Sequence, residues 1–156
     1  MGRGGRHMHY RKPKRREIVE FMLKEFDHVG VVVKDSDETM ALLSTLFGFE
    51  VTERQEFPEQ GFRSTLVTKE KVTIELIEPM GQEGIIQKFV SKHGYGLHHI
   101  SLRVDNIEKT MAMLSEKGAR LLQEKPTRIT ETSEISFLHP GSTAGILIEL
   151  MHRAST

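Results

Sequence analysis

The chain has 156 residues, of which 37% are hydrophobic and 28% charged, as is ordinary for a globular protein. Lysine plus arginine and aspartate plus glutamate balance at 22 each, which argues against nucleic acid or an anionic membrane surface as a partner. The absence of cysteine excludes disulfides, thiolate catalysis and cysteine-based zinc sites, and fits the cytoplasmic location that we expect.

The first segment of the chain is strongly basic. "MGRGGRHMHYRKPKRR" holds seven arginines or lysines and no acidic residue. We expect residues 1–24 to be a flexible extension, or in part an expression tag, and assign them no function.

The next segment predicts a strand, a helix and three further strands. Val29, Val31 and Val33 alternate as in a strand with one packed face. Asp35 and Ser36 are typical of a helix start. The helix would pack through Met40, Leu43 and Phe47 and end at Gly48. Strands would follow at Glu50–Glu53, Phe62–Thr68 and Val72–Ile77, the last with Val72 on the packed face.

A second segment repeats this order after a connecting helix in "GQEGIIQKFVSKHG". Ile100, Leu102 and Val104 predict the strand, and Asp105 with Asn106 the helix start. The helix would pack through Met111 and Leu114, end at Gly118, and be followed by strands at Arg120–Leu122, Glu134–Leu138 and Ile146–Met151, with Ile146 on the packed face.

The two segments are internal repeats. "HVGVVVKDSDETMALLS", from His28, matches "HISLRVDNIEKTMAMLS", from His99, at seven positions, and "IEL" occurs at 74–76 and again at 148–150. We therefore predict an α+β fold for residues 25–153. Two tandem βαβββ modules, about 25–79 and 96–153, would form a single domain with a curved mixed sheet.

The repeat places one histidine and one glutamate at equivalent positions in each half of the chain. Because strand residues alternate between faces, the side chains of His28, Glu75, His99 and Glu149 should all point away from the helices. Any one of them alone is more typical of a structural or solvent-facing residue. Brought together by a pseudo-twofold axis, buried carboxylates would need a cation. We therefore predict a divalent metal site, with manganese, cobalt, nickel or zinc as candidates and open positions for water or substrate.

Three further residues bear on this site, and two of them have alternative interpretations. Arg103 lies on the same predicted face as His99, where it would meet a substrate carboxylate or form a salt bridge. His139 would line the mouth of the site or cap a turn. His98 should point away from His99 and take no part.

The chain resembles a known superfamily through "DHVGVVV", "IEL", "HHISLRVDNIE" and "ILIEL". These strings are similar to those of the vicinal oxygen chelate superfamily, which includes glyoxalase I, bleomycin-resistance proteins and extradiol dioxygenases. The likeness runs from Phe26 to about His152. Within it, "VTIELIEPMGQEGIIQKFVSKHGYGLHHISLRVDNIE" and "ISFLHPGSTAGILIEL" most resemble the methylmalonyl-CoA epimerase family.

The resemblance implies a glyoxalase-like fold and a metal-dependent isomerase, with metal bound by His28, Glu75, His99 and Glu149. It also implies an acyl-CoA thioester as substrate, proton transfer at the carbon alpha to the thioester, and a homodimer. Ser64, a candidate substrate contact, stands where some epimerases have glutamate, and Gly141 where a lysine often stands. Glu75 and Glu149 would then exchange the proton.

Two other functions fit the same superfamily. Glyoxalase I (lactoylglutathione lyase) isomerises a hemithioacetal and can use two histidines and two glutamates as ligands. A bleomycin-resistance-type protein binds a ligand without catalysis and needs no such cluster. The paired histidines and glutamates favour an enzyme.

Overall fold

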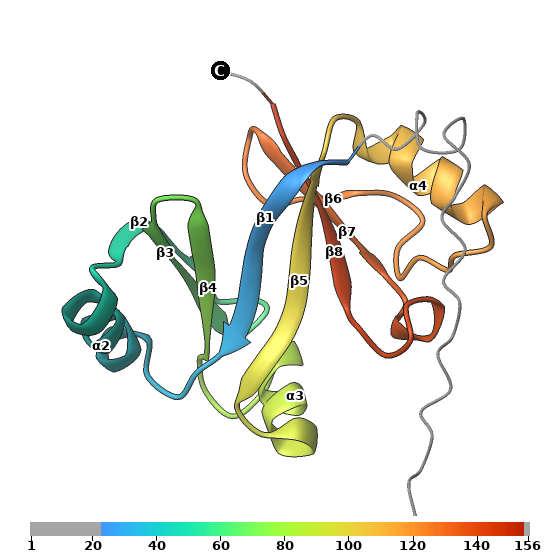
Figure 1. Ribbon diagram of the computed structural model, residues 1–156. Helices are drawn as coiled ribbons and strands as arrows, with labels where there is room; N and C mark the ends of the chain where they lie inside the picture. The colour runs from blue at the N-terminus through green and yellow to red at the C-terminus, as the bar shows by residue number, and fades with distance from the viewer. Residues whose placement is uncertain (1–22, 155–156) are drawn as a thin grey trace, which may run out of the picture.

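Eight strands form one curled mixed sheet with three α-helices in residues 23–154, which the computed structural model describes (Figure 1). The elements are β1 (Leu23–Val32), α2 (Ser36–Phe47), β2 (Glu50–Phe57), β3 (Phe62–Lys69), β4 (Val72–Pro79), α3 (Ile85–His93), β5 (Gly96–Val104), α4 (Ile107–Glu116), β6 (Thr127–Arg128), β7 (Ser133–Leu138), the 3₁₀ turn η1 (Pro140–Ser142) and β8 (Ile148–Arg153). The predicted basic extension, residues 1–24, lies outside the described residues except for its last two, which begin β1.

The strand order β2-β3-β4-β1-β5-β8-β7-β6 divides into two related halves. β1 is parallel to β4, and β5 is parallel to β8, so the two repeats pair their strands in the same way. The two halves join through antiparallel pairing of β1 with β5, which lie side by side in the middle of the sheet (Figure 1). This arrangement confirms the predicted α+β fold of two βαβββ modules.

Each half has its own hydrophobic core beneath a helix. Leu76 and Val67 are almost completely buried against Met40 and Leu43 of α2. In the second half, Val104, Leu138 and Leu150 pack with Met111 of α4. The two helices therefore cover the two ends of one face of the sheet and leave its centre to the strands (Figure 1).

The connecting helix α3 packs on the opposite face. Its Ile86 is buried with Val32 and Ile77, which lie on the same sides of their strands as His28 and Glu75. α3 thus closes one end of the concave face. None of the helices in residues 23–154 is both long and apolar enough to cross a membrane.

The predicted starts of α2 and α4 are confirmed, because a capping side chain begins each helix. The Asp35 carboxylate accepts a hydrogen bond from the backbone N–H of Glu38, and the Asn106 side chain accepts one from Lys109. Gly48 ends α2 with φ of 72°, a conformation in which glycine has no steric penalty.

The predicted strand at Arg120–Leu122 is wrong. Only Leu121 forms a bridge there, with Leu138, and the strand at this sheet edge is the short β6 instead. The Gln123 side chain explains the difference, because its Oε1 accepts the backbone N–H of Phe137 at 2.9 Å. A side chain therefore takes the place that the next main-chain carbonyl would occupy in a ladder.

Three residues predicted to pack are largely exposed: Phe47 (63%), Val72 (53%) and Ile146 (49%). Phe47 is the last residue of α2 and Val72 the first of β4, while Ile146 precedes β8. Each therefore lies at or beyond the end of an element, where the neighbouring helix or strand no longer covers it.

Candidate metal centre

Two rungs of the sheet, separated by one rung, bring four polar side chains onto its concave face. Gly30 of β1 pairs with Glu75 of β4 on one side and with His99 of β5 on the other. Two rungs along, Ser101 of β5 pairs with His28 and with Glu149 of β8. The repeat relates one rung to the other, so each half supplies one histidine and one glutamate.

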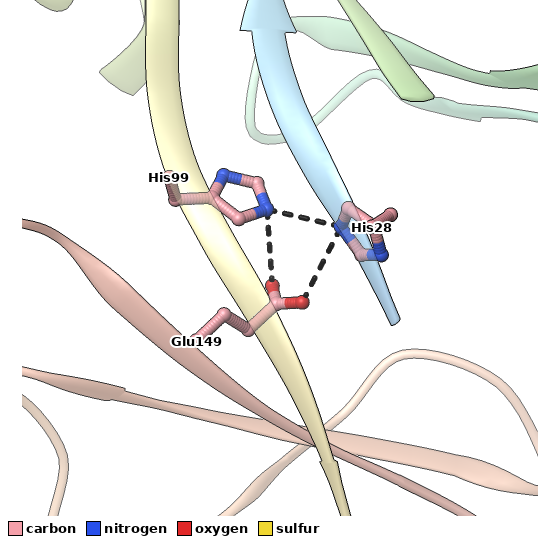
Figure 2. Close-up of side chains that lie close together, drawn as sticks. All are labelled: His28, His99 and Glu149. Atoms are coloured by element: carbon pink, nitrogen blue, oxygen red, sulfur yellow. Dashed lines mark hydrogen bonds and ion pairs between the residues drawn. The ribbon is translucent and has the colours of Figure 1, made fainter. Parts of the chain in front are cut away.

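The four side chains meet at their tips. The Nε2 atoms of His28 and His99 lie 3.1 Å apart, and Glu75 Oε2 is 3.3 Å from each of them. Glu149 completes the group at 3.6 Å from His28 Nε2 and 3.9 Å from His99 Nε2 (Figure 2). His28, His99 and Glu149 each offer a ligand atom, all within 4.8 Å of one another, a spacing at which one ion can bind all three.

The cluster is shielded from solvent. His28 is 2% exposed, Glu149 5% and His99 6%, and the Glu75 side chain is 15% exposed. In the described part of the chain no lysine or arginine lies within 4.0 Å of either carboxylate. Two buried carboxylates beside two imidazoles are a donor set that a divalent ion fits.

Serine hydroxyls hold the two carboxylates. Ser64 Oγ of β3 donates to Glu75 Oε1 at 2.6 Å, and Ser101 Oγ donates to Glu149 Oε1 at 2.7 Å. The remaining oxygen of each carboxylate, Oε2, is the one that approaches His99.

The two imidazoles differ in protonation when no cation lies between them. Burial lowers the pKa of His28, but contacts with Asp27 and Glu75 outweigh this effect and raise it to about 10. Burial lowers the pKa of His99 to about 4, and the charge of Glu75 only partly offsets it. At neutral pH His28 therefore carries a proton that His99 lacks.

The two carboxyl groups also differ. Burial raises the pKa of Glu75, but the contact with His28 and the charges of both imidazoles outweigh it and lower the pKa to about 2. Burial and the charge of Glu75 raise the pKa of Glu149 to about 7. One carboxyl is fully ionised at neutral pH and the other is near its midpoint.

A cavity of about 430 Å³ opens above the cluster. Its walls are largely apolar, with Phe57 and Phe62 from one half and Ile135, Phe137 and Met151 from the other. Polar groups from Gln55, Gln60, Gln123 and Arg128 are also present. This size and mixed lining are typical of a small-molecule site.

The other three predicted site residues do not line the cavity. Ser64 reaches it only through Glu75. Arg103 is held by the carboxylates of Glu25 and Asp27, and His139 accepts the backbone N–H of Gly141 at the start of η1. Neither Arg103 nor His139 lines the cavity, and a substrate role for each stays a prediction.

His98 corrects the sequence analysis. Strand alternation predicted that it points away and takes no part, yet it lines the cavity and its Nδ1 lies 2.9 Å from Nδ1 of His99. The other missed contact is Asp27, whose carboxylate meets His28 Nδ1 at 2.7 Å. Each of these two residues immediately precedes a predicted ligand in the sequence. Its position in the dipeptide Asp27-His28 or His98-His99 is the feature from which its contact with that ligand could have been predicted.

Comparisons with known proteins agree with this geometry. Residues 27–139 match the family model of the glyoxalase/bleomycin resistance protein/dioxygenase superfamily. The chain belongs to this superfamily.

Several relatives within it are named as epimerases. The chain is 33% identical over 129 residues to a mitochondrial methylmalonyl-CoA epimerase of Bos taurus, covering 82% of this chain and 74% of the relative. It is 32% identical to an ethylmalonyl-CoA/methylmalonyl-CoA epimerase of Cereibacter sphaeroides, covering 83% and 98%. A solved Streptomyces coelicolor methylmalonyl-CoA epimerase variant, in complex with 2-nitronate-propionyl-CoA, superposes with a TM-score of 0.79 at 31% identity, covering 86% and 97%.

These likenesses confirm the resemblance seen in the sequence. The chain belongs to the methylmalonyl-CoA epimerase family within the superfamily and is an enzyme with an epimerase-like function. This family is metal-dependent, and the cluster of His28, His99 and Glu149 is capable of binding an ion.

We predict that Gly30→Ala destabilises the protein by about 1–3 kcal/mol, because the site leaves no room for a methyl group. A Cβ at this position would lie 2.3 Å from His99 Cε1. Urea unfolding measures the loss. The matched control is the same substitution in a His99→Ala background, where the obstructing ring is gone and the cost should largely disappear. An equal cost in both backgrounds would contradict the packing argument.

We also predict that zinc binding to this cluster releases protons in a pH-dependent number. The cluster holds a proton on His28 up to about pH 10 and one on Glu149 up to about pH 7. Binding needs both removed, so about two protons should leave at roughly pH 6 and about one at roughly pH 8.5. Affinity therefore rises with pH, more steeply below the pKa of Glu149. Calorimetry in two buffers of different ionisation enthalpy counts the protons, and a constant count across this range would argue against the assignment.

Proposed function

We propose that this enzyme is a divalent-metal-dependent epimerase that moves a proton at the carbon alpha to a thioester, with methylmalonyl-CoA as its first candidate substrate. The observation that carries the proposal is the convergence of His28, Glu75, His99 and Glu149 from both halves on one cavity. The named activities of its relatives support the same reaction.

These four residues would hold the ion. Their mixed nitrogen and oxygen donors suit cobalt, zinc, nickel or manganese, and the donor set alone favours none of these over the others. When bound, such an ion supplies a Lewis acid that polarises carbonyl and carboxylate oxygens and stabilises negative charge on them.

The two glutamates are the proposed acid and base. Inversion at the reacting carbon requires that a proton leave from one face and another arrive at the opposite face. Glu75 and Glu149 come from β4 and β8, which flank the central pair of strands on opposite sides. Their carboxyl groups therefore approach a molecule bound between them from two directions. Each would act in this role when its Oε2 is not engaged with the ion.

Ser64 supports this assignment of roles. Its hydroxyl donates to Glu75 and lies no closer to the cavity than that carboxylate, which leaves Glu75 as the ionisable group at this position. Against the effect of burial, the contact with His28 and the charges of the two imidazoles are the main causes that lower the pKa of Glu75, and the hydrogen bond from Ser64 acts in the same direction. Ser64 would then orient the base and would not exchange the proton itself.

The cavity accommodates the acyl end of a CoA thioester. A volume of about 430 Å³ is too small for a whole CoA but sufficient for a short branched acyl group and its thioester. The structurally similar Streptomyces coelicolor epimerase was solved with a CoA ligand, which supports this substrate class. The homodimer and the cytoplasmic location expected from the sequence stay predictions.

Metal retention tests the ligand assignment. We expect His99→Ala and Glu149→Ala each to lose bound metal without unfolding, because each removes a donor from the cluster while leaving the two hydrophobic cores intact. Elemental mass spectrometry after gel filtration measures the metal, and circular dichroism the fold. His93→Ala, which removes an exposed histidine of α3, is the control and should retain the parent's metal content. Equal metal content in all three variants would refute the assignment.

Proton exchange tests the reaction. With cobalt-loaded protein in deuterated buffer, we expect the C2 proton of methylmalonyl-CoA to be replaced by deuterium, as followed by NMR, and a chelator to block this replacement. Protein that binds metal fully yet exchanges nothing would exclude the epimerase. Turnover of a glutathione hemithioacetal in its place would indicate glyoxalase I chemistry, while binding without turnover of either would indicate a bleomycin-resistance-type protein.

A further inference from the structure

We propose that Asp27 and His98 are positioning residues for the metal site, each holding the outer nitrogen of the histidine that follows it. This inference rests on the proposed metal site. The two residues occupy equivalent positions in the repeat, 71 residues apart, immediately before His28 and His99. Their chemistry differs, so we further infer that the two halves bind the ion with unequal strength.

Asp27 is fixed firmly behind His28. Its carboxylate is 3% exposed and contacts His28 Nδ1 at 2.7 Å through Oδ2. Its other oxygen accepts a hydrogen bond from Arg103 Nε of β5 at 2.9 Å. The carboxylate cannot turn away from the imidazole without breaking its bonds to Arg103.

The network behind Asp27 extends across the molecule. Arg153 of β8 lies 3.9 Å from the same oxygen of Asp27, and its guanidinium reaches Glu53 of β2 at 3.7 Å. β2 and β8 are not neighbours in the sheet, so this chain of charges spans the concave face. It ties the orientation of His28 to strands of both halves.

His98 supports His99 in the same way but with a neutral group. Its Nδ1 lies 2.9 Å from His99 Nδ1, and its ring meets the edge of Phe89 at a centroid distance of 4.7 Å. α3 therefore fixes the ring of His98, and His98 fixes that of His99. With Nδ1 occupied on the outside, Nε2 of each predicted ligand is directed to the centre of the cluster.

Because the two histidines have different partners, we expect them to bind the ion with different strength. A carboxylate that accepts the Nδ1 proton raises the basicity of an imidazole and fixes its tautomer. Asp27 therefore makes His28 the stronger donor, whereas the neutral ring of His98 orients His99 without adding charge. Loss of the charge at position 27 should cost more metal affinity than a neutral replacement at position 98.

Matched variants test this difference. Asp27→Asn keeps an oxygen near Nδ1 but removes the charge, and we expect it to weaken cobalt binding by about 10–100-fold, measured by titration of the visible cobalt absorption against a competing chelator. His98→Asn exchanges one neutral partner for another and should weaken binding by less than Asp27→Asn does. Glu25→Gln is the control. It removes the exposed carboxylate on the other side of Arg103, leaves Asp27 in place, and should bind as the parent does.

A second measurement needs no substitution at Asp27. In the zinc-loaded parent protein, ¹⁵N NMR of the imidazoles should find the proton of His28 on Nδ1. If Asp27→Asn fails to fold, Arg103→Gln replaces it, because loss of the guanidinium releases the carboxylate and should also weaken cobalt binding.

The outcomes separate this inference from the proposed function. A parent protein that binds no cobalt would overturn both. A parent that binds cobalt, with Asp27→Asn or Arg103→Gln binding equally well, would overturn only the positioning role of Asp27. A larger loss in His98→Asn than in Asp27→Asn would overturn the inequality of the two halves, and an Nε2 proton on His28 would overturn the assigned orientation.

Discussion

The antiparallel pairing of β1 with β5 is the constraint on which the site depends. Each half of the chain carries one histidine and one glutamate, too few for a metal centre of this kind. The pairing of Gly30 with His99, and of Ser101 with His28, sets the two halves in the one register that brings all four side chains together. A slip of one residue would send one histidine to the opposite face. The same backbone hydrogen bonds therefore hold the fold together and assemble the site.

Burial then gives this assembly its chemistry. The helices α2 and α4 cover the convex face, and α3 closes one end of the concave face, so the cluster lies in a region of low dielectric. There the four groups cannot all keep their ordinary protonation, and the pKa values spread from about 2 for Glu75 to about 10 for His28. A divalent cation would relieve this conflict, since it removes the repulsion between the carboxylates and needs both imidazoles neutral.

The sequence predicts the fold and the cluster because both rest on periodicity. The repeat fixes the order of elements, and strand alternation places His28, Glu75, His99 and Glu149 on one face. What it misses depends on local details in three dimensions. His98 departs from the strand alternation because it lies at a β-bulge: Gly30 pairs with His99 but Val31 pairs with Leu97, so the register shifts at His98. The strand at Arg120–Leu122 fails because the Gln123 amide replaces a main-chain acceptor. Neither effect follows from the periodicity of the sequence, so neither could be predicted from it.

Divergence between the two halves follows from their unequal surroundings. At the position equivalent to Gly30 the second half has Ser101, whose hydroxyl holds Glu149, whereas the ring of His99 leaves Gly30 no room for a side chain. Glu75 must then take its hydroxyl from Ser64, on a different strand. The two carboxylates thus share a position in the repeat but not an environment, and their pKa values lie on opposite sides of the ordinary one. These pKa values describe the cluster without an ion. With an ion bound, the two carboxylates would still differ in their serine partners and in the strands that carry them, which suits a reaction that treats the two faces of its substrate differently.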